Sequence, residues 1–472
     1  MTASRDPRLP VPSHVTRRRF LQAGGVGALA MGVPGTVAAS VEASRGLAGG
    51  AAPRSCIFVL LCGGPSHLDT WDLKPDAPDE IRGPYRPIAS KVPGMRISEL
   101  HPRLSGLTPH FTLIRSMTHV GNISNHFDAM HHLLSGQAMA PADSPYLGSI
   151  VSRVRAGDRK VADYVWLIRC VGDPVFCAPN IGTGGHLGAQ HAPLFVGRRH
   201  QSPALPTFRA PDVLQPVDDP TRLASRRRLL AGLGSTTGRD PATRDWDDLH
   251  GRALDLARGS AARQVFDMDR EPRTVRERYG MHPLGQNLLL ARRLVEAGVG
   301  FVTVNGWTGA PAGQQPTGGP PASSWDMHGS EMGMGNAFGT GPYGLGWCSP
   351  CLDQGLSALL TDLLARGMLD RTLVVVMGEF GRTPRINQPR GNPGRQHWPS
   401  CWSAIIAGGG IRGGTVYGET DKIGAYVKDR PVRVQDLGAT VFHALDIAGD
   451  RRLGKDGFTR PVSSGQPLRE LF

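Results

Sequence analysis

Short apolar runs alternate with amphipathic stretches along most of the chain. The clearest run, TLVVVM at Thr372–Met377, is uninterrupted and rich in β-branched residues, as in a strand buried on both faces. Similar runs lie at 56–62, 111–115, 300–304 and 404–407. Apolar residues at helical spacing predict helices near 285–297, 352–366 and 434–445. Strands that alternate with helices predict an α/β fold, with a mainly parallel sheet covered by helices on both faces.

Two stretches depart from this alternation. Residues 197–285 are polar and favour helix, so we expect an inserted helical or irregular cap there. Residues 306–347 are rich in Gly, Pro and Ser and predict a long loop, which inside a domain is usually functional. Both stretches belong to one predicted domain, residues 48–472.

The N-terminal residues resemble a targeting signal. A twin-arginine pattern at Thr16–Gln22 precedes a Gly/Ala-rich apolar segment and small residues near Ala39. We therefore expect residues 1–47 to direct export by the twin-arginine pathway, to the periplasm or the exterior. The alternative is a chance arginine cluster before a core helix. The apolar segment falls short of the about 20 strongly apolar residues that a membrane span needs, and no later segment qualifies.

The charge pattern bears on possible partners. The formal net charge is +13, but the basic residues are scattered, and Arg226–Arg228 predicts a solvated helix face. No basic stripe is interleaved with aromatic residues, which argues against nucleic-acid binding. The overall charge favours anionic small molecules weakly.

Cysteine spacing indicates no metal site. The chain has seven dispersed cysteines, and Cys348 and Cys351 have the spacing of a redox or zinc pair. Because no second pair completes a zinc site, we expect a local disulfide or two ordinary thiols.

Polar clusters with metal-ligating side chains follow the predicted strands. They lie at 63–72, at 116–132, at 324–329, and at Glu379 with His397. Ligands bind beyond the carboxyl ends of the strands in open α/β sheets, so these loops can meet at one edge. Carboxylates and imidazoles suit zinc, manganese or iron. The alternative is that these side chains cap turns and helices.

Several longer motifs point to one family. They are GGPSHLDT at 63–70, GAQHAP at 188–193, LVEAGV at 294–299, WDMH at 325–328 and GEFGRTP at 378–384. From Cys56 to Leu445 the chain resembles the DUF1501 group, secreted relatives of the alkaline phosphatase and sulfatase superfamily. The resemblance implies an alkaline-phosphatase-like fold and a metal-assisted hydrolase site.

The resemblance also implies metal ligands. Asp326, His328 and His397 match the positions that hold one ion in the superfamily. The ion is expected to be divalent, with zinc first and manganese, iron or calcium as alternatives.

A second metal position is altered in this chain. The superfamily's late Asp-His pair matches Glu379 and Phe380 here, and a phenyl ring cannot bind a metal. Asp69 is the first-strand carboxylate expected to contribute. The imidazoles that could replace the missing histidine are His126, predicted as a ligand, and His67 and His119.

Candidate catalytic groups follow from the same resemblance. Ser116 and Ser124 fit loosely the superfamily's nucleophile near a helix N-terminus, and Ser66 is a third option. Arg382 or Arg115 can bind an anionic oxygen, or either can be a structural ion-pair partner.

These inferences predict an exported metal-dependent hydrolase of phosphate or sulfate esters. Its substrate would be a small anionic ester or a sulfated or phosphorylated polymer. The alternative is a non-catalytic metal- or glycan-binding protein on a degenerate phosphatase scaffold, which Phe380 favours. A cofactor-dependent oxidoreductase is a third possibility, but no Gly-x-Gly-x-x-Gly motif opens a helix.

Overall fold

The computed structural model describes residues 54–155, 161–167, 184–197, 202–214, 260–314, 324–387, 391–455 and 458–472, with scattered residues between 221 and 232. The predicted signal region, 1–47, lies outside the described residues. So do parts of the predicted cap at 197–285 and of the loop at 306–347.

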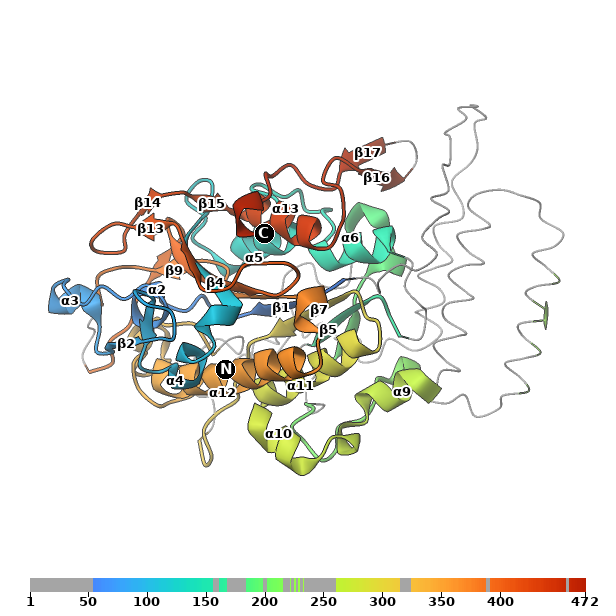
Figure 1. Ribbon diagram of the computed structural model, residues 1–472, viewed down its shortest axis with the longest axis horizontal. Helices are drawn as coiled ribbons and strands as arrows, with labels where there is room; N and C mark the ends of the chain where they lie inside the picture. The colour runs from blue at the N-terminus through green and yellow to red at the C-terminus, as the bar shows by residue number, and fades with distance from the viewer. Residues whose placement is uncertain are drawn as a thin grey trace, which may run out of the picture. The chain divides into compact units, whose positions relative to one another are not determined.

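A nine-stranded sheet forms the centre of the described part of the chain (Figure 1). Its order is β12 (Thr415–Tyr417), β4 (Phe111–Thr118), β11 (Trp402–Ala407), β8 (Thr372–Met377), β1 (Ser55–Leu60), β7 (Phe301–Asn305), β5 (Tyr164–Leu167) and β6 (Leu194–Val196), and β15 (Val432–Arg433) also pairs with β4. Strand β11 runs antiparallel to β4 and β8, whereas the other strand pairs of this sheet are parallel.

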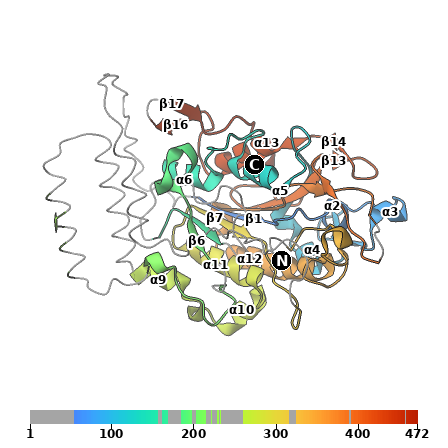
Figure 2. The same ribbon diagram turned by 180° about the vertical axis from the view of Figure 1, so that it is seen from behind.

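Helices cover both faces of the sheet, as Figures 1 and 2 show. One face carries α10 (Arg273–Tyr279), α11 (Pro283–Glu296) and α12 (Leu345–Ala365), and the other carries α5 (His126–Ser135), α6 (Leu147–Val154) and α13 (Val434–Ala444). Alternate residues of β1 serve the two layers: Ile57 packs with the leucines of α11 and α12, and Phe58 with the other helices. Burying one such side chain stabilises the fold by about 1.5–3 kcal/mol.

The remaining elements are short. They are α2 (His67–Thr70), α3 (Asp79–Arg82), α4 (Pro102–Ser105), α9 (Ser260–Phe266) and the ribbons β2 (Pro87–Ala89) with β3 (Arg96–Ser98), β9 (Gly381–Arg382) with β10 (His397–Trp398), β13 (Glu419–Thr420) with β14 (Val427–Asp429), and β16 (Arg452–Lys455) with β17 (Phe458–Pro461). Ribbon β9–β10 matters most, because it lies between β8 and β11 in the chain and carries His397.

The predicted fold class is confirmed: the fold is α/β, with a mainly parallel sheet between two helical layers. The five predicted strands and three predicted helices are present, although α12 begins earlier than predicted, at Leu345. Cys348 and Cys351 therefore lie inside a helix, and both are free thiols. Strands β5, β6, β12 and β15 and the antiparallel direction of β11 were not predicted.

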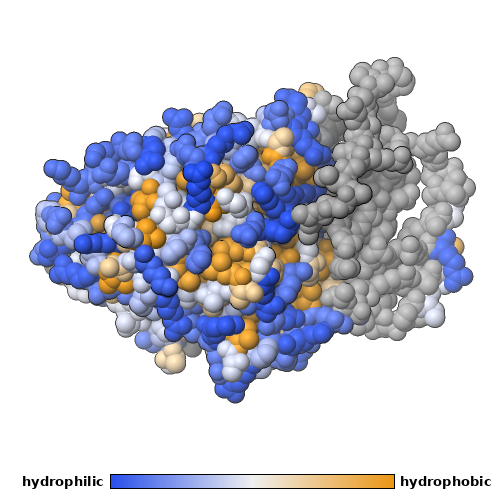
Figure 3. Space-filling view, viewed as in Figure 1, coloured by the Kyte–Doolittle hydropathy of each residue, from blue (hydrophilic) through white to orange (hydrophobic). Residues whose placement is uncertain are grey.

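The surface in Figure 3 is mostly hydrophilic, with apolar residues in small groups. Such groups are usual on the water-facing surface of a globular domain. Among the described helices, none combines the length and the apolar character that crossing a membrane requires.

Candidate metal centre

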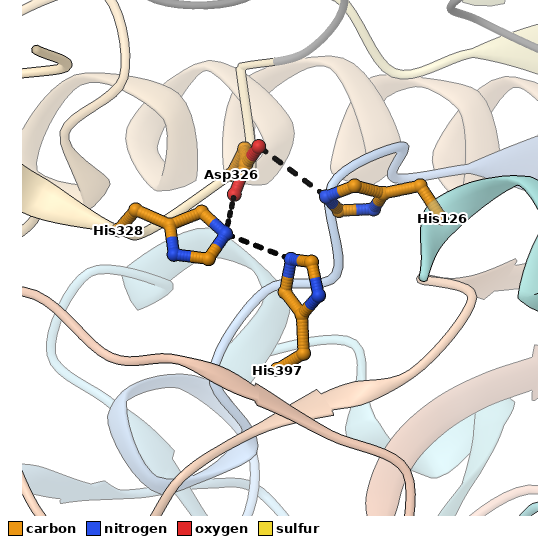
Figure 4. Close-up of side chains that lie close together, drawn as sticks. All are labelled: His126, Asp326, His328 and His397. Atoms are coloured by element: carbon orange, nitrogen blue, oxygen red, sulfur yellow. Dashed lines mark hydrogen bonds and ion pairs between the residues drawn. The ribbon is translucent and has the colours of Figure 1, made fainter. Parts of the chain in front are cut away.

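Four side chains from distant parts of the sequence converge at one point (Figure 4). They are His126, Asp326, His328 and His397, and one ligand atom from each lies within 4.8 Å of the others. His126 is the first residue of α5, Asp326 and His328 lie in the connection after β7, and His397 lies in β10.

The sheet topology explains why these segments meet. Strand β4 leads to His126, and β7 leads to Asp326 and His328, so both approach from the carboxyl ends of parallel strands. Strand β11 runs in the opposite direction, so its beginning lies at that same edge, and β10 comes just before it. The site therefore has the usual position of a ligand site in an open α/β sheet.

The contacts within the cluster are close. The Nε2 atoms of His328 and His397 are 2.8 Å apart. His328 Nε2 lies 3.2 Å from Asp326 Oδ1, and His126 Nε2 lies 3.3 Å from Asp326 Oδ2. Asp326 and His328 are buried, whereas His126 and His397 are partly exposed and form the open side.

Each imidazole is held from outside the cluster by an oxygen atom near its Nδ1. The three contacts, each 2.6 Å long, are His126 to Glu379 Oε1, His328 to Gln396 Oε1, and His397 to the backbone carbonyl of Ser124. These oxygens accept hydrogen bonds, so Nδ1 is the atom that donates. In a neutral imidazole the lone pair is then on Nε2. Those of His126 and His328 face the carboxylate of Asp326, and that of His397 faces Nε2 of His328.

This donor set fits a divalent cation. Two Nε2 lone pairs facing each other at 2.8 Å cannot hydrogen-bond to each other, and the buried Nε2 of His126 has no polar neighbour closer than Asp326 Oδ2, 3.3 Å away. An ion among them would satisfy every one of these atoms. Imidazole nitrogen and carboxylate oxygen suit zinc, iron or manganese, and hydrogen bonds to the far ring nitrogens are typical of metal-bound histidines.

Burial and nearby charges set the protonation of Asp326, His328 and His397. Burial alone would raise the pKa of Asp326, but Arg382 and the neighbouring histidines outweigh it and hold that pKa well below its usual range. Burial, reinforced by Arg382, lowers the pKa of His397 to about 2, and burial also lowers the pKa of His328. These three groups therefore have the protonation states that a metal requires.

His126 behaves differently because it lies between two carboxylates. Burial opposes its charged form, but hydrogen bonds and attraction to Asp326 and Glu379 outweigh that effect and raise its pKa to about 9. A cation bound to Nε2 would take the place of the second ring proton.

A comparison with known families identifies the chain. The model of the family described as "Protein of unknown function (DUF1501)" matches residues 53–472. The chain belongs to the DUF1501 family. No curated protein sequence matches it.

Solved structures similar to this DUF1501 protein include hydrolases. The phosphonate monoester hydrolase SpPMH from Silicibacter pomeroyi is 13% identical, with 88% of this chain and 76% of that chain covered and a TM-score of 0.38. The PsFucS1 sulfatase from Pseudoalteromonas sp. is 12% identical, with 88% and 74% covered and a TM-score of 0.37. A protein in the alkaline phosphatase superfamily from Vibrio parahaemolyticus is 10% identical, with 84% and 67% covered and a TM-score of 0.38.

In the DUF1501 protein, Arg382 connects the cluster to the turn after β1. Its guanidinium is completely buried, lies 2.6 Å from Asp326 Oδ1, and donates to the carbonyls of Gly63, Gly64 and Arg395. With these acceptors around it, the Arg382 side chain fixes the position of Asp326.

Asp69 does not join the four-residue cluster. Its carboxylate is completely buried and accepts from Arg395, at 2.8 Å from Nε and 3.2 Å from Nη2. Glu379 also lies outside the four, against the far edge of the His126 ring.

The candidate serines lie in different surroundings, and Ser66 is completely buried. Ser116 is buried in β4, and its hydroxyl donates to the carbonyl of Arg430 at 2.6 Å. Ser124 is exposed, and its carbonyl accepts from His397, so its backbone borders the cluster.

Phe380 forms a wall of the site. Its ring is completely buried, with its centroid 4.9 Å from that of His126 and 4.5 Å from that of His397. The aromatic ring therefore occupies space beside two ligands of the DUF1501 cluster.

Sequence reasoning missed the outer partners of the ligands. Gln396 and the carbonyl of Ser124 hold two of the imidazoles, and the N–H of Gly63 donates to Glu379. Gln396 precedes His397 directly, and that adjacency was the one available signal.

Proposed function

We propose that this DUF1501 protein is an exported metal-dependent hydrolase of phosphate or sulfate esters. One divalent ion, with zinc as the first choice, would be held by the cluster of His126, Asp326, His328 and His397. The observation that carries the proposal is the convergence of three imidazole Nε2 atoms with the carboxylate of Asp326, while an outer oxygen holds Nδ1 of each ring.

The metal, when bound, would polarise the ester oxygen and lower the pKa of a coordinated water. The protein would supply the geometry. Arg382 holds Asp326 in place, and the partly exposed edges of His126 and His397 leave an approach for the substrate. Among the three candidate nucleophiles, Ser124 is exposed and next to His397, whereas Ser66 and Ser116 are completely buried.

The substrate class follows from charge and from the family resemblance. A small anionic ester or a sulfated or phosphorylated polymer would be attracted weakly by the net charge, which falls from +13 to about +9 without the six arginines, Asp6 and Glu42 of residues 1–47. The twin-arginine pattern before residue 47 supports action in the periplasm or outside the cell.

Purified mature protein tests the proposal. We expect about one transition-metal ion per chain by elemental analysis, as in a mononuclear site with these ligands. We also expect turnover of at least one member of a panel of aryl phosphates, phosphate diesters and aryl sulfates. Asp326→Asn and His397→Ala should lose both the ion and the turnover. A folded protein that takes up no metal contradicts the proposal.

The non-catalytic alternative has its own support. Four protein ligands around one ion are typical of structural zinc sites, whereas catalytic sites usually keep one position open. Full metal occupancy without turnover across the whole panel would favour a metal- or glycan-binding role.

A further inference from the structure

We propose that Glu379 is a positioning residue of the metal centre: it holds His126 by Nδ1 and does not bind the ion itself. The inference deepens the proposed function and rests on its ligand set, but it does not depend on which ester, if any, is hydrolysed.

The Glu379 side chain is fixed on two sides. It is completely buried, and its Oε1 and Oε2 atoms lie 2.9 and 3.2 Å from the backbone N–H of Gly63. Oε1 also lies 2.6 Å from Nδ1 of His126. The backbone carbonyl of Glu379 accepts from His119 Nε2 at 2.6 Å, so the main chain is held as well.

The His126 ring separates this carboxylate from the cluster. Nδ1 faces Glu379, and Nε2, on another edge of the ring, faces Asp326 at 3.3 Å. The four ligand atoms that lie within 4.8 Å of one another include none from Glu379. A carboxylate in this position orients the imidazole and raises the basicity of Nε2, as outer partners of metal-bound histidines do.

The Gly63–Gly64 turn gives this arrangement a basis in the sequence. Both glycines have positive φ, at 111° for Gly63 and 72° for Gly64. A Cβ on Gly64 would lie 2.6 Å from the carbonyl oxygen of Phe380. Glycine at both positions therefore allows the turn to lie against Glu379–Phe380 and to present the Gly63 N–H to the Glu379 carboxylate.

A double-mutant cycle tests the assignment through metal affinity. Zinc affinity is measured by competition with a chromophoric chelator in the full mature chain, the Glu379→Gln variant, the His126→Ala variant and the double variant. We expect Glu379→Gln alone to weaken affinity by about 10- to 100-fold. In the His126→Ala background the same change should alter affinity by less than about twofold, because the residue through which Glu379 acts is gone.

The controls separate positioning from general damage. Asp353→Asn removes another buried carboxylate that accepts backbone N–H groups, from Arg103 and Leu104, outside the cluster, and should leave zinc affinity unchanged. The visible spectrum of the cobalt-loaded protein should change in Glu379→Gln and not in Asp353→Asn. Circular dichroism of each variant checks the fold, and Glu379→Asp provides a second, charge-preserving variant with an intermediate effect.

Two results would overturn the inference. One is an equal loss of affinity from Glu379→Gln with and without His126, which would make Glu379 a ligand in its own right. The other is unchanged affinity in Glu379→Gln. If the double-mutant cycle gives the expected zinc affinities but no ester is hydrolysed, the proposed function is overturned and the assignment of Glu379 stands.

Discussion

Arg395 Nε lies 2.8 Å from Asp69 Oδ2, and both side chains are completely buried. The pair joins α2, which follows the turn after β1, to the segment that carries His397. Arg395 also donates to the carbonyls of Ile81, Thr383 and Pro384, so its guanidinium joins α2, α3 and the loop after β9.

Replacing Asp69 with Asn should therefore be costly. The change leaves the Arg395 charge buried without its counter-charge, and the unfolding free energy should fall by about 3–5 kcal/mol. Denaturant titration measures this effect. The matched control is Asp429→Asn, which breaks the exposed Arg430–Asp429 pair and should change stability by less than about 1 kcal/mol. A small effect of Asp69→Asn on the free energy of unfolding would mean that the Arg395–Asp69 pair is not essential for stability.

The loss of stability caused by Arg382→Met should depend on whether zinc is bound. In the metal-free protein, Asp326 loses its buried guanidinium partner, and we expect a loss of about 3–5 kcal/mol in stability. Zinc would compensate part of that charge, so zinc should stabilise the variant more than it stabilises the unmodified protein. Denaturant titrations with zinc and with a chelator provide the comparison. Equal stabilisation of both proteins by zinc would contradict the role assigned to Arg382.

Phe380→Ala should affect both stability and metal binding. Loss of the buried ring should cost about 3–5 kcal/mol, and the His126 and His397 rings would lose the wall that limits their rotation. We therefore expect weaker zinc affinity. Phe58→Ala, in the sheet core, should cost similar stability without changing zinc affinity, which separates the two effects.

His101 should make stability depend on pH. Its ring is completely buried, neither ring nitrogen has a hydrogen-bond partner, and burial lowers its pKa from 6.5 to about 3. Between these values the unfolded chain binds a proton that the folded ring does not, so stability is present above pH 6.5 and is lost as the pH falls.

Between pH 3 and pH 6.5 the His101 ring should change the free energy of unfolding by up to about 1.4 kcal/mol per pH unit. The measurement is urea unfolding at several pH values with a chelator present, so that metal loss does not contribute. His101→Phe removes the titration, and its stability should fall less steeply with acid. Parallel curves for the two proteins would show that another group is responsible.

The sequence predicted five strands of the central sheet, because these strands are defined by local apolar runs. Thr372–Met377 is β-branched throughout, and the strand has those bounds in the structure. The direction of β11 could not be predicted in the same way. Its pairing with β4 and β8 depends on contacts between segments far apart in the chain, and no short-range pattern encodes them.

The candidate site was predictable to the extent that motifs name ligand types. Asp326, His328 and His397 followed from the resemblance, and His126 was named as a substitute imidazole. The partner of each residue was not predictable, because Asp69 and Glu379 are both acidic residues a short distance after a strand. Only the fold shows that one faces Arg395 and the other faces His126.

The reversed strand also limits how this protein can evolve. Only Trp398–Cys401 separate His397 from the start of β11, so the ligand is attached to the sheet by a short segment. An insertion there would displace the imidazole. The connection from Asn305 to Asp326 is much longer, and its two ends are joined: Thr308 N donates to Ser324 Oγ, and Trp325 Nε1 donates to the carbonyl of Gly306. An insertion between Thr308 and Ser324 can therefore leave Asp326 in place. New recognition segments are therefore expected to accumulate before Asp326, while the spacing after His397 stays constant among homologues.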